Sequence, residues 1–329
     1  MSEERGHEGF SGESTQYLSQ QYGGVHSAKW VDLFPRPWIP YIQLVRLSPP
    51  IAPLVIYLPH FCGAMHAARI KGLATSEVLH TCLLLLGGSL FYSNAAHIWN
   101  DLIDAPIDRR VARTKTRPIA RGDITPKQAF IFAVSQALCA FAFLLFLPRA
   151  VATSTIPSII GAIYYPWAKL HSYFPQFLLG AVLAWGAVVG ASTLGIEKPW
   201  TDAPTMCLVM ALALWNSILD TIYTYQDIAD DERVGIKNLA ILFKENTKSL
   251  LWFLFALDGG FLIVYGVLIR AGSRYYLITA VGCISSLAVM IAKVDLQGQA
   301  SCWRWFSIGF WSPGAFLSLG LLFEYVSSC

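Results

Sequence analysis

The stretch "LLLLGGSLFYSNAAHIWNDLIDAPID", residues 83–108, begins as an apolar run and ends with three acidic side chains, Asp101, Asp104 and Asp108. Its apolar part is close to the length of a membrane-spanning helix, which needs about 20 predominantly apolar residues. Carboxylates are costly within or at the edge of a bilayer and tend to be functional where they occur there. The stretch therefore predicts a membrane helix that carries chemically active acids at one end.

The composition of the whole chain indicates several such helices. Hydrophobic residues make up 55% of the 329 residues, charged residues only 14%, and the mean hydropathy is +0.49. These values are too apolar for an ordinary soluble domain. We therefore expect an all-α, polytopic membrane protein, a bundle of about nine transmembrane helices at 44–68, 76–100, 126–148, 150–169, 174–195, 203–226, 248–269, 275–293 and 304–326.

The first 38 residues differ from the rest of the chain because they are polar and contain several glutamates. The acids and the missing apolar core argue against a signal peptide and against a mitochondrial presequence. We expect a flexible polar tail at 1–38, with a short amphipathic piece at 30–42 on the membrane surface, followed by a transmembrane domain at 39–329.

The positive charges are distributed unevenly between the two sides of the predicted bundle. Most of the 24 lysine and arginine residues fall on the side that holds the N-terminus and the acids of 101–108. The positive-inside rule places that side in the cytosol. The protein is expected to be multi-pass in the endoplasmic reticulum or another endomembrane, and its small net charge of +3 gives no reason to expect a nucleic-acid partner.

A second acidic segment, "LDTIYTYQDIADDERVGIKN" at 219–238, lies at the end of another predicted span on the same side. At about 100° per residue, Asp220, Tyr223, Asp227 and Asp231 fall on one narrow stripe of a helix. Asn100, Asp104 and Asp108 share a face in the same way. Each of the two helices therefore presents a column of oxygen ligands.

Two facing columns of carboxylates repel each other unless a cation lies between them. Hard oxygen ligands suit Mg²⁺, which keeps several waters and bridges to substrate phosphates. Arginines and a lysine nearby can contact the remaining phosphate oxygens; they are Arg109, Arg113, Arg117 and Lys237. The residues thus predict a magnesium diphosphate site.

The sequence resembles the UbiA superfamily of intramembrane aromatic prenyltransferases, most closely its fungal meroterpenoid branch. The first family signature, NDxxDxxxD followed by RTxxRPxxxG, matches Asn100, Asp101, Asp104, Asp108, Arg113, Thr114, Arg117, Pro118 and Gly122. The second, DxxYxxxDxxxD followed by GxK, matches Asp220, Tyr223, Asp227, Asp231, Gly235 and Lys237. A third and weaker match, YPxxK…PQxxLG, runs through Tyr165, Pro166, Lys169, Pro175, Gln176 and Gly180.

The resemblance implies a nine-helix bundle around a central cavity that binds an isoprenoid diphosphate and an aromatic acceptor. In such a site the catalytic carboxylates Asp104, Asp108, Asp227 and Asp231, with Asn100, hold Mg²⁺. The substrate-binding residues are then Asn100, Arg113, Arg117, Lys237, Arg46, Tyr223, Lys169 and Asp220, and Asp220 is by position alone a candidate base.

The reaction that the resemblance implies leaves an allylic cation, which an aromatic carbon captures in a dry, apolar pocket. Aromatic faces can stabilise such a cation. The candidate rings are Tyr164, Tyr165, Trp167, Trp215 and Tyr223, most of which we expect to be ordinary packing. We also expect His97 to be a packed imidazole that could border the site.

The acceptor side departs from the family members that prenylate 4-hydroxybenzoate. Their RxDKPIG motif here reads "RLSPPIA" at 46–52, and their Lys-Arg pair becomes Lys169-Leu170. Fewer cations favour a phenolic polyketide or pyrone acceptor. The resemblance to the meroterpenoid branch leads us to expect a farnesyl or geranylgeranyl donor. The alternatives are a 4-hydroxybenzoate polyprenyltransferase of ubiquinone biosynthesis, a synthase that prenylates a tetrapyrrole, and a cation transporter lined by acidic columns.

Overall fold

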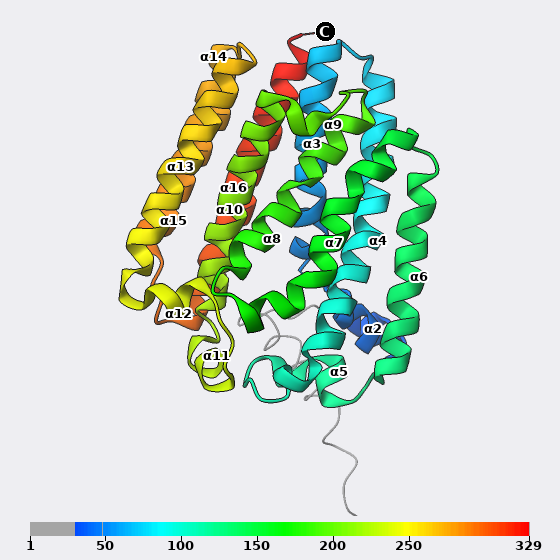
Figure 1. The fold of residues 1–329 in the computed structure, drawn as a ribbon, viewed down its shortest axis with the longest axis vertical. Helices are drawn as coiled ribbons and strands as arrows, with labels where there is room; N and C mark the ends of the chain where they lie inside the picture. The colour runs from blue at the N-terminus through cyan, green and yellow to red at the C-terminus, as the bar shows by residue number, and fades with distance from the viewer. Residues whose placement is uncertain (1–29, 48, 329) are drawn as a thin grey trace, which may run out of the picture.

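The computed structural model describes residues 30–47 and 49–328, and within those ranges it is helical without a β-strand (Figure 1). The predicted all-α class is therefore confirmed. The elements are η1 Val31–Leu33, η2 Arg36–Trp38, α2 Ile39–Leu44, α3 Ile51–Lys71, α4 Thr75–Asp108, η3 Thr114–Thr116, α5 Pro118–Arg121, α6 Pro126–Leu144, α7 Arg149–His171, α8 Pro175–Ala184, α9 Gly186–Thr193, η4 Pro199–Thr201, α10 Ala203–Thr224, α11 Ile228–Val234, α12 Leu239–Phe243, η5 Lys244–Asn246, α13 Thr247–Leu268, α14 Ser273–Tyr275, the π-helix η6 Tyr276–Ala280, α15 Val281–Lys293 and α16 Gln299–Val326.

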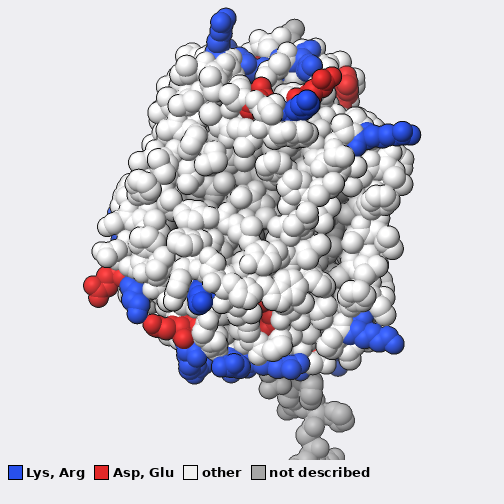
Figure 2. Space-filling view, in the orientation of Figure 1, with Lys and Arg blue, Asp and Glu red and all other residues white. Residues whose placement is uncertain are grey.

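Eight helical segments in the described part of the chain have the length and apolar composition that crossing a bilayer requires. The one predicted span outside this count, 150–169, corresponds to α7, which has 23 residues but is not apolar enough to be included. On the face shown in Figure 2, charged side chains gather at the two ends of the molecule and the middle is almost entirely uncharged. This distribution fits a bundle whose middle contacts lipid tails.

The end of α4 extends beyond the predicted apolar span, as the expected shared helix face of Asn100, Asp104 and Asp108 requires. The predicted span stops at residue 100, whereas α4 continues without a break to Asp108. Asp104 and Asp108 therefore project from a rigid helix and not from a loop, and the four-residue spacing places them on the same face as Asn100.

The second acidic segment is not one continuous helix, which corrects the expected stripe. α10 ends at Thr224, and Asp227 has non-helical backbone angles (φ −122°, ψ 8°) and precedes α11. α11 ends in turn at Gly235, whose φ of 82° lies in the left-handed region that glycine tolerates best. Asp220 and Tyr223 are thus held by α10, while Asp231 is held by α11.

The half of the bundle away from the acids is closely packed. A Cβ atom at Gly63 of α3 would lie 2.0 Å from the carbonyl oxygen of Ala187, and one at Gly190 of α9 would lie 2.0 Å from that of His60. The absence of these atoms lets the backbones of α3 and α9 touch. This contact leaves no room between α3 and α9 at this level of the bundle.

α16 crosses the bundle with a proline in its middle. Pro313 has no N–H group, so the carbonyl oxygen of Gly309 loses its usual helical partner. The indole nitrogen of Trp215 on α10 donates to that oxygen at 2.9 Å, and the Trp215 ring stacks on Phe310. The unused acceptor of α16 thereby attaches this helix to α10.

Most of the predicted tail, residues 1–29, lies outside the described residues. The remainder, 30–38, forms the turns η1 and η2, in which Trp30, Leu33, Phe34 and Trp38 are exposed. The prediction that this segment lies on the membrane surface stays a prediction.

Candidate active site

A cavity of about 300 Å³ opens at the end of the bundle where α5 and α11 lie. We call it the central cavity; its walls come from α3, α4, α7, α8, α10 and α16 and from the segments after α4 and α10. Twelve of the residues that the sequence indicated for the site line it: Arg46, Asn100, Asp104, Asp108, Arg113, Arg117, Lys169, Asp220, Tyr223, Asp227, Asp231 and Lys237.

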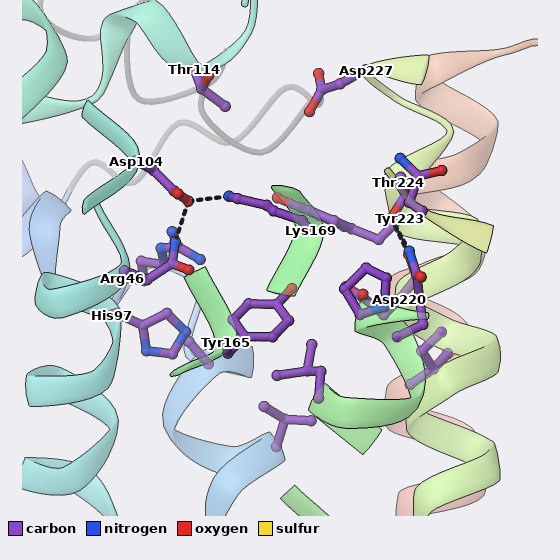
Figure 3. A pocket seen from close by; sticks show the side chains of 18 of the residues that line it. Arg46, His97, Asp104, Thr114, Tyr165, Lys169, Asp220, Tyr223, Thr224 and Asp227 are labelled. Atoms are coloured by element: carbon purple, nitrogen blue, oxygen red, sulfur yellow. Dashed lines mark hydrogen bonds and ion pairs between the residues drawn. The ribbon is translucent and has the colours of Figure 1, made fainter. Parts of the chain in front are cut away.

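One wall of the cavity is the acidic face of α4. Asp104 is 2% exposed and forms an ion pair with Lys169, which reaches across from α7 (Figure 3). Asn100 donates from its side-chain nitrogen to Asp104 Oδ2 at 2.9 Å. Lys169, which only the weaker third motif indicated, therefore contacts the first acidic column directly.

Arg117 binds the same wall at its last residue, Asp108. Its Nη1 donates to both oxygens of Asp108, at 3.2 and 3.0 Å, and to Asp101 Oδ1 at 3.2 Å. Asp101 is fully buried, does not line the cavity, and also accepts from Arg46 at 2.6 Å. The first acid of the motif thus positions two cavity arginines, a role that its place one residue away from the stripe did not reveal.

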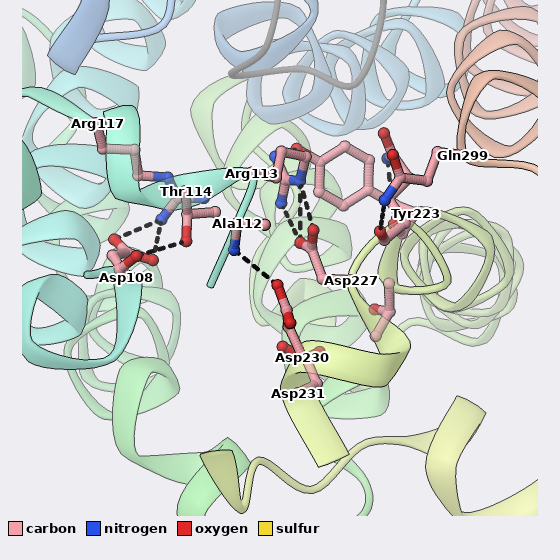
Figure 4. A network of polar contacts seen from close by, with 12 residues as sticks. Asp108, Ala112, Arg113, Thr114, Arg117, Tyr223, Asp227, Asp230, Asp231 and Gln299 are labelled. Atoms are coloured by element: carbon pink, nitrogen blue, oxygen red, sulfur yellow. Dashed lines mark hydrogen bonds and ion pairs between the residues drawn. The ribbon is translucent and has the colours of Figure 1, made fainter. Parts of the chain in front are cut away.

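The opposite wall is organised by Arg113, which lies between the two acidic segments (Figure 4). Its Nε donates to both oxygens of Asp227 at 2.9 Å, and its Nη1 donates to the Tyr223 hydroxyl at 3.0 Å. Burial alone would lower the pKa of Arg113, but Tyr223 and Asp227 raise it above its ordinary value. Arg113 therefore stays charged in the cavity.

Asp231 lies beside this pair and has no cation of its own. Its Oδ2 accepts from the Asn238 side chain at 3.2 Å. Burial raises the pKa of Asp231 to about 7, and the neighbouring charge of Asp227 acts in the same direction. A further acid, Asp230, accepts from the backbone nitrogen of Ala112 at 2.6 Å and so ties the segment after α4 to α11 (Figure 4).

The remaining predicted cations differ in their placement. Lys237 lines the cavity with its ammonium over the Tyr173 ring, 5.7 Å from the centroid, and its backbone nitrogen donates to Lys169 O at 2.7 Å. Arg109, which was expected to contact phosphate, is exposed, donates to Ala120 O and does not line the cavity. The expectation for Arg109 is therefore wrong.

The carboxylates do not form a ready-made metal cluster. Among the residues described, no group of three or more His, Cys, Asp and Glu side chains is close enough together to hold an ion. Basic side chains occupy the space between the two walls, where the sequence suggested a metal. The donor set nevertheless suits Mg²⁺, because Asn100 Oδ1 and Asp104 Oδ1 are buried without a hydrogen-bond partner and are hard oxygen ligands.

Only two of the five candidate aromatic rings reach the central cavity, Tyr165 and Tyr223. Tyr164 is 47% exposed outside it, Trp167 packs edge-on against Trp99, and Trp215 lies in the core against Phe310. This agrees with the expectation that most of these rings are packing.

The sequence did not single out the aromatic pair that α16 contributes to the cavity. Trp303 and Phe306 line it, and the Phe306 ring centroid lies 4.9 Å from that of Tyr223. The three motifs end at Lys237, whereas Trp303 and Phe306 lie on α16, so no motif includes them. His97 does border the cavity, as expected, and its Nδ1 lies 2.7 Å from Ser93 O.

Comparison with known proteins gives a consistent result. Residues 56–319 match the model of the UbiA prenyltransferase family. The chain is 31% identical over 302 residues to Prenyltransferase stbC of Stachybotrys bisbyi, with 90% of each chain covered. It is 32% identical over 305 residues to the mitochondrial 4-hydroxybenzoate polyprenyltransferase of Saccharomyces cerevisiae, covering 90% of this chain and 79% of the relative.

A solved structure shares the fold. It is that of a UbiA homologue from Archaeoglobus fulgidus bound to GPP and Mg²⁺, with a TM-score of 0.61, 16% sequence identity, and coverage of 83% of this chain and 99% of the other. The family match spans most of the chain and includes both acidic motifs. The chain therefore belongs to the UbiA prenyltransferase family and is a multi-pass membrane prenyltransferase.

Proposed function

We propose that the protein transfers a farnesyl or geranylgeranyl chain from its diphosphate to an aromatic or pyrone acceptor, with Mg²⁺, in meroterpenoid biosynthesis. The observation that carries the proposal is the division of the central cavity. Its mouth holds two acidic walls and several cations, whereas its deeper part is lined by apolar side chains of α3, α7 and α8. A diphosphate fits the first part and a prenyl chain the second.

The mouth supplies ligands for both halves of a metal diphosphate. Asp104, Asp108, Asp227 and Asp231, with Asn100, would hold Mg²⁺, which when bound neutralises charge on the departing diphosphate. The likeness to a homologue bound to GPP and Mg²⁺ supports this assignment. Of the four acids, Asp104, Asp108 and Asp227 each pair with a basic side chain in the protein alone.

These pairs suggest an exchange of partners when the substrate binds. In the protein alone, Arg113, Arg117 and Lys169 each donate to a carboxylate of the cavity. Once the carboxylates bind the metal, the same three cations are free to donate to phosphate oxygens, with Lys237 beside them. The charge balance of the cavity is thereby kept while the donor enters, and no cation is left without an anion.

The acceptor would lie between Arg46, Tyr165 and Asp220, which face one another across the cavity (Figure 3). Arg46 is already bound to Asp101 at 2.6 Å, but its Nε is buried without a partner and can donate to a phenolic or carbonyl oxygen. Asp220 would orient the acceptor or take its proton. The apolar inner walls would keep water away from the allylic cation.

4-Hydroxybenzoate is the second candidate acceptor, and the yeast relative carries that activity in its name. The engagement of Arg46 with Asp101, together with Pro49 at the cavity and Leu170 outside it, argues for an acceptor without a carboxylate. Membership of a prenyltransferase family leaves the cation-transport hypothesis without support.

The test incubates membranes containing the protein with Mg²⁺, radiolabelled farnesyl or geranylgeranyl diphosphate, and a panel of phenolic, pyrone and 4-hydroxybenzoate acceptors. The proposal expects a prenylated phenol or pyrone and loss of product when the metal is chelated. Product with 4-hydroxybenzoate alone would move the assignment to ubiquinone biosynthesis. Background release of diphosphate with every acceptor would overturn the proposed reaction.

We further propose that the acidic end of the bundle faces the cytosol from an endomembrane. The support is the excess of lysine and arginine on that side. Labelling of a cysteine introduced at the exposed Lys244 should require no permeabilisation of the endomembrane, whereas a cysteine at Lys198 should require it. The reverse pattern would overturn the orientation.

A further inference from the structure

The face of α4 that lines the central cavity continues beyond the acids. Tyr92, Ala96, Asn100, Asp104 and Asp108 follow one another at intervals of four residues, and all five line the cavity. Carboxylates and an amide occupy the mouth, alanine follows, and a tyrosine is the innermost member. The stripe therefore runs along the direction in which a prenyl chain would extend away from its diphosphate.

Tyr92 is the innermost residue of α4 that lines the cavity. Ile56 is the innermost lining residue of α3, and beyond it the backbones of α3 and α9 touch at Gly63 and Gly190. On α7 the innermost lining residue is Ala162, and a Cβ at the preceding Gly161 would lie 2.3 Å from the Val182 side chain. Tyr92 is the largest of the residues at this closed end.

The Tyr92 side chain is fixed at this closed end. Its hydroxyl donates to the carbonyl oxygen of Ser158 on α7 at 3.0 Å and so bridges α4 and α7. Trp99 makes a second bridge between the same helices, donating to Ile163 O at 3.1 Å. Because its hydroxyl would lose this partner on moving, the Tyr92 ring resists displacement by a substrate.

The length of the stripe sets a limit on the chain. Tyr92 and Asp104 are twelve residues apart, which corresponds to about 18 Å along a helix. With carbon–carbon bonds of about 1.5 Å, each five-carbon unit of an extended prenyl chain advances about 5 Å. Counted from a first prenyl carbon level with Asp104, with the diphosphate toward the mouth, three units span about 15 Å and four about 20 Å by the same bond length. The third unit then ends before Tyr92 and the fourth meets its ring.

We propose that Tyr92 is the specificity residue that limits the prenyl chain to fifteen carbons. The inference rests on the proposed function, because it assumes that the diphosphate lies at Asp104. Within that assignment it selects the farnesyl donor over the geranylgeranyl donor, and it identifies the side chain that makes the selection.

The test measures binding without requiring the acceptor. Purified protein with Mg²⁺ is titrated by calorimetry with non-hydrolysable thiolodiphosphates that carry 10, 15 or 20 carbons. We expect the fifteen-carbon analogue to bind the wild-type protein best and the twenty-carbon analogue about tenfold more weakly, because a chain that overfills a packed site is penalised. In Tyr92→Ala the twenty-carbon analogue should bind at least as well as the fifteen-carbon one.

Two further variants keep the test independent of folding defects. Tyr92→Phe retains the ring but loses the bond to Ser158 O, so its preference for fifteen carbons should fall by a smaller factor. Tyr164→Ala removes a tyrosine of α7 that is 47% exposed and lies outside the cavity, and this variant should keep the wild-type preference.

The outcomes distinguish failure of the chain-length limit from failure of the proposed function. Wild-type protein that binds the twenty-carbon analogue as tightly as the fifteen-carbon one overturns the limit, as does an unchanged preference in Tyr92→Ala. Absence of binding by all three analogues in the presence of Mg²⁺ overturns the proposed function itself.

Discussion

The two ends of the bundle both bury charged groups, but they use them differently. At the end opposite the acidic motifs, His66 Nδ1 lies 3.0 Å from the Tyr265 hydroxyl and its Nε2 lies 3.3 Å from Asp202 Oδ2. Beside them Glu324 lies 3.4 Å from Arg69 Nε and accepts from the backbone nitrogen of Gly272. None of these groups lines the central cavity.

The two ends differ in where buried oxygen atoms without a hydrogen-bond partner lie. Asn100 and Asp104 line the central cavity and each has a buried oxygen without a hydrogen-bond partner, whereas Asp258 and Thr279, which also have one, lie outside the cavity. Unsatisfied buried groups are costly and point to a missing ligand, while satisfied ones hold elements together. We infer that one end serves substrate binding and the other serves stability.

The largest expected effect is on the acidic walls. Asp104→Asn, Asp108→Asn, Asp227→Asn and Asp231→Asn should each lower turnover by about a hundredfold or more, because each removes a charge that would face the metal diphosphate. Product formation and thermal unfolding are measured on the same preparations. Asp123→Asn is the matched control, since Asp123 lies near the same end but is outside the cavity and pairs with Arg121. Near-wild-type turnover in all four variants would show the site assignment to be wrong.

A smaller and more selective effect is expected at the cations. Arg113→Ala should raise the KM for the prenyl diphosphate about tenfold and change that for the acceptor less than twofold, because charged hydrogen bonds contribute about 1.5–3 kcal/mol. Lys237→Ala should act in the same direction but more weakly, as its ammonium lies over Tyr173 and not beside an acid. Initial rates at varied concentrations of each substrate give the two constants. Equal losses for both substrates would contradict this division of roles.

At the opposite end we expect a substitution to lower stability and to leave turnover unchanged. Glu324→Gln should weaken the contact with Arg69 and lower the Tm by a few degrees, since breaking a partly buried pair costs about 1–3 kcal/mol. Turnover per folded molecule should stay within twofold of the wild type. A loss of turnover at unchanged Tm would break the comparison between the two ends.

The smallest expected effect is on how the stability of this end of the bundle depends on pH. The hydrogen bond from His66, with those from Thr205, lowers the pKa of Asp202 to about 2. A carboxyl with a depressed folded-state pKa contributes stability above its unfolded pKa, about 4, and loses that contribution as the pH falls toward 2. The Tm difference between wild type and Asp202→Asn should therefore shrink between pH 5 and pH 2.5. A difference that grows on acidification would contradict this sign.

Much of the architecture follows from local sequence. Apolar runs of sufficient length located the spans, because in a bilayer the backbone must satisfy its own hydrogen bonds within a helix. The least accurate start is that of the first span, predicted at 44–68, because α3 begins only at Ile51. The apolar run of this span ended at residue 100, but the four-residue spacing of Asn100, Asp104 and Asp108 indicated that the helix continues, and α4 does run to Asp108. The turn between α10 and α11 was missed because the spacing of Asp220, Tyr223, Asp227 and Asp231 suits a continuous helix equally well.

The candidate acids of the site were indicated by the sequence alone, because costly acids at helix ends, spaced by four, are informative without any structure. Their partners were decided only by the tertiary structure. Lys169 reaches Asp104 from another helix, Arg113 reaches Asp227 across 114 residues, and Trp303 and Phe306 arrive from α16. Such pairings depend on how helices pack, and helix packing is set by contacts such as that of Gly63 with Ala187, which no local pattern of charges encodes.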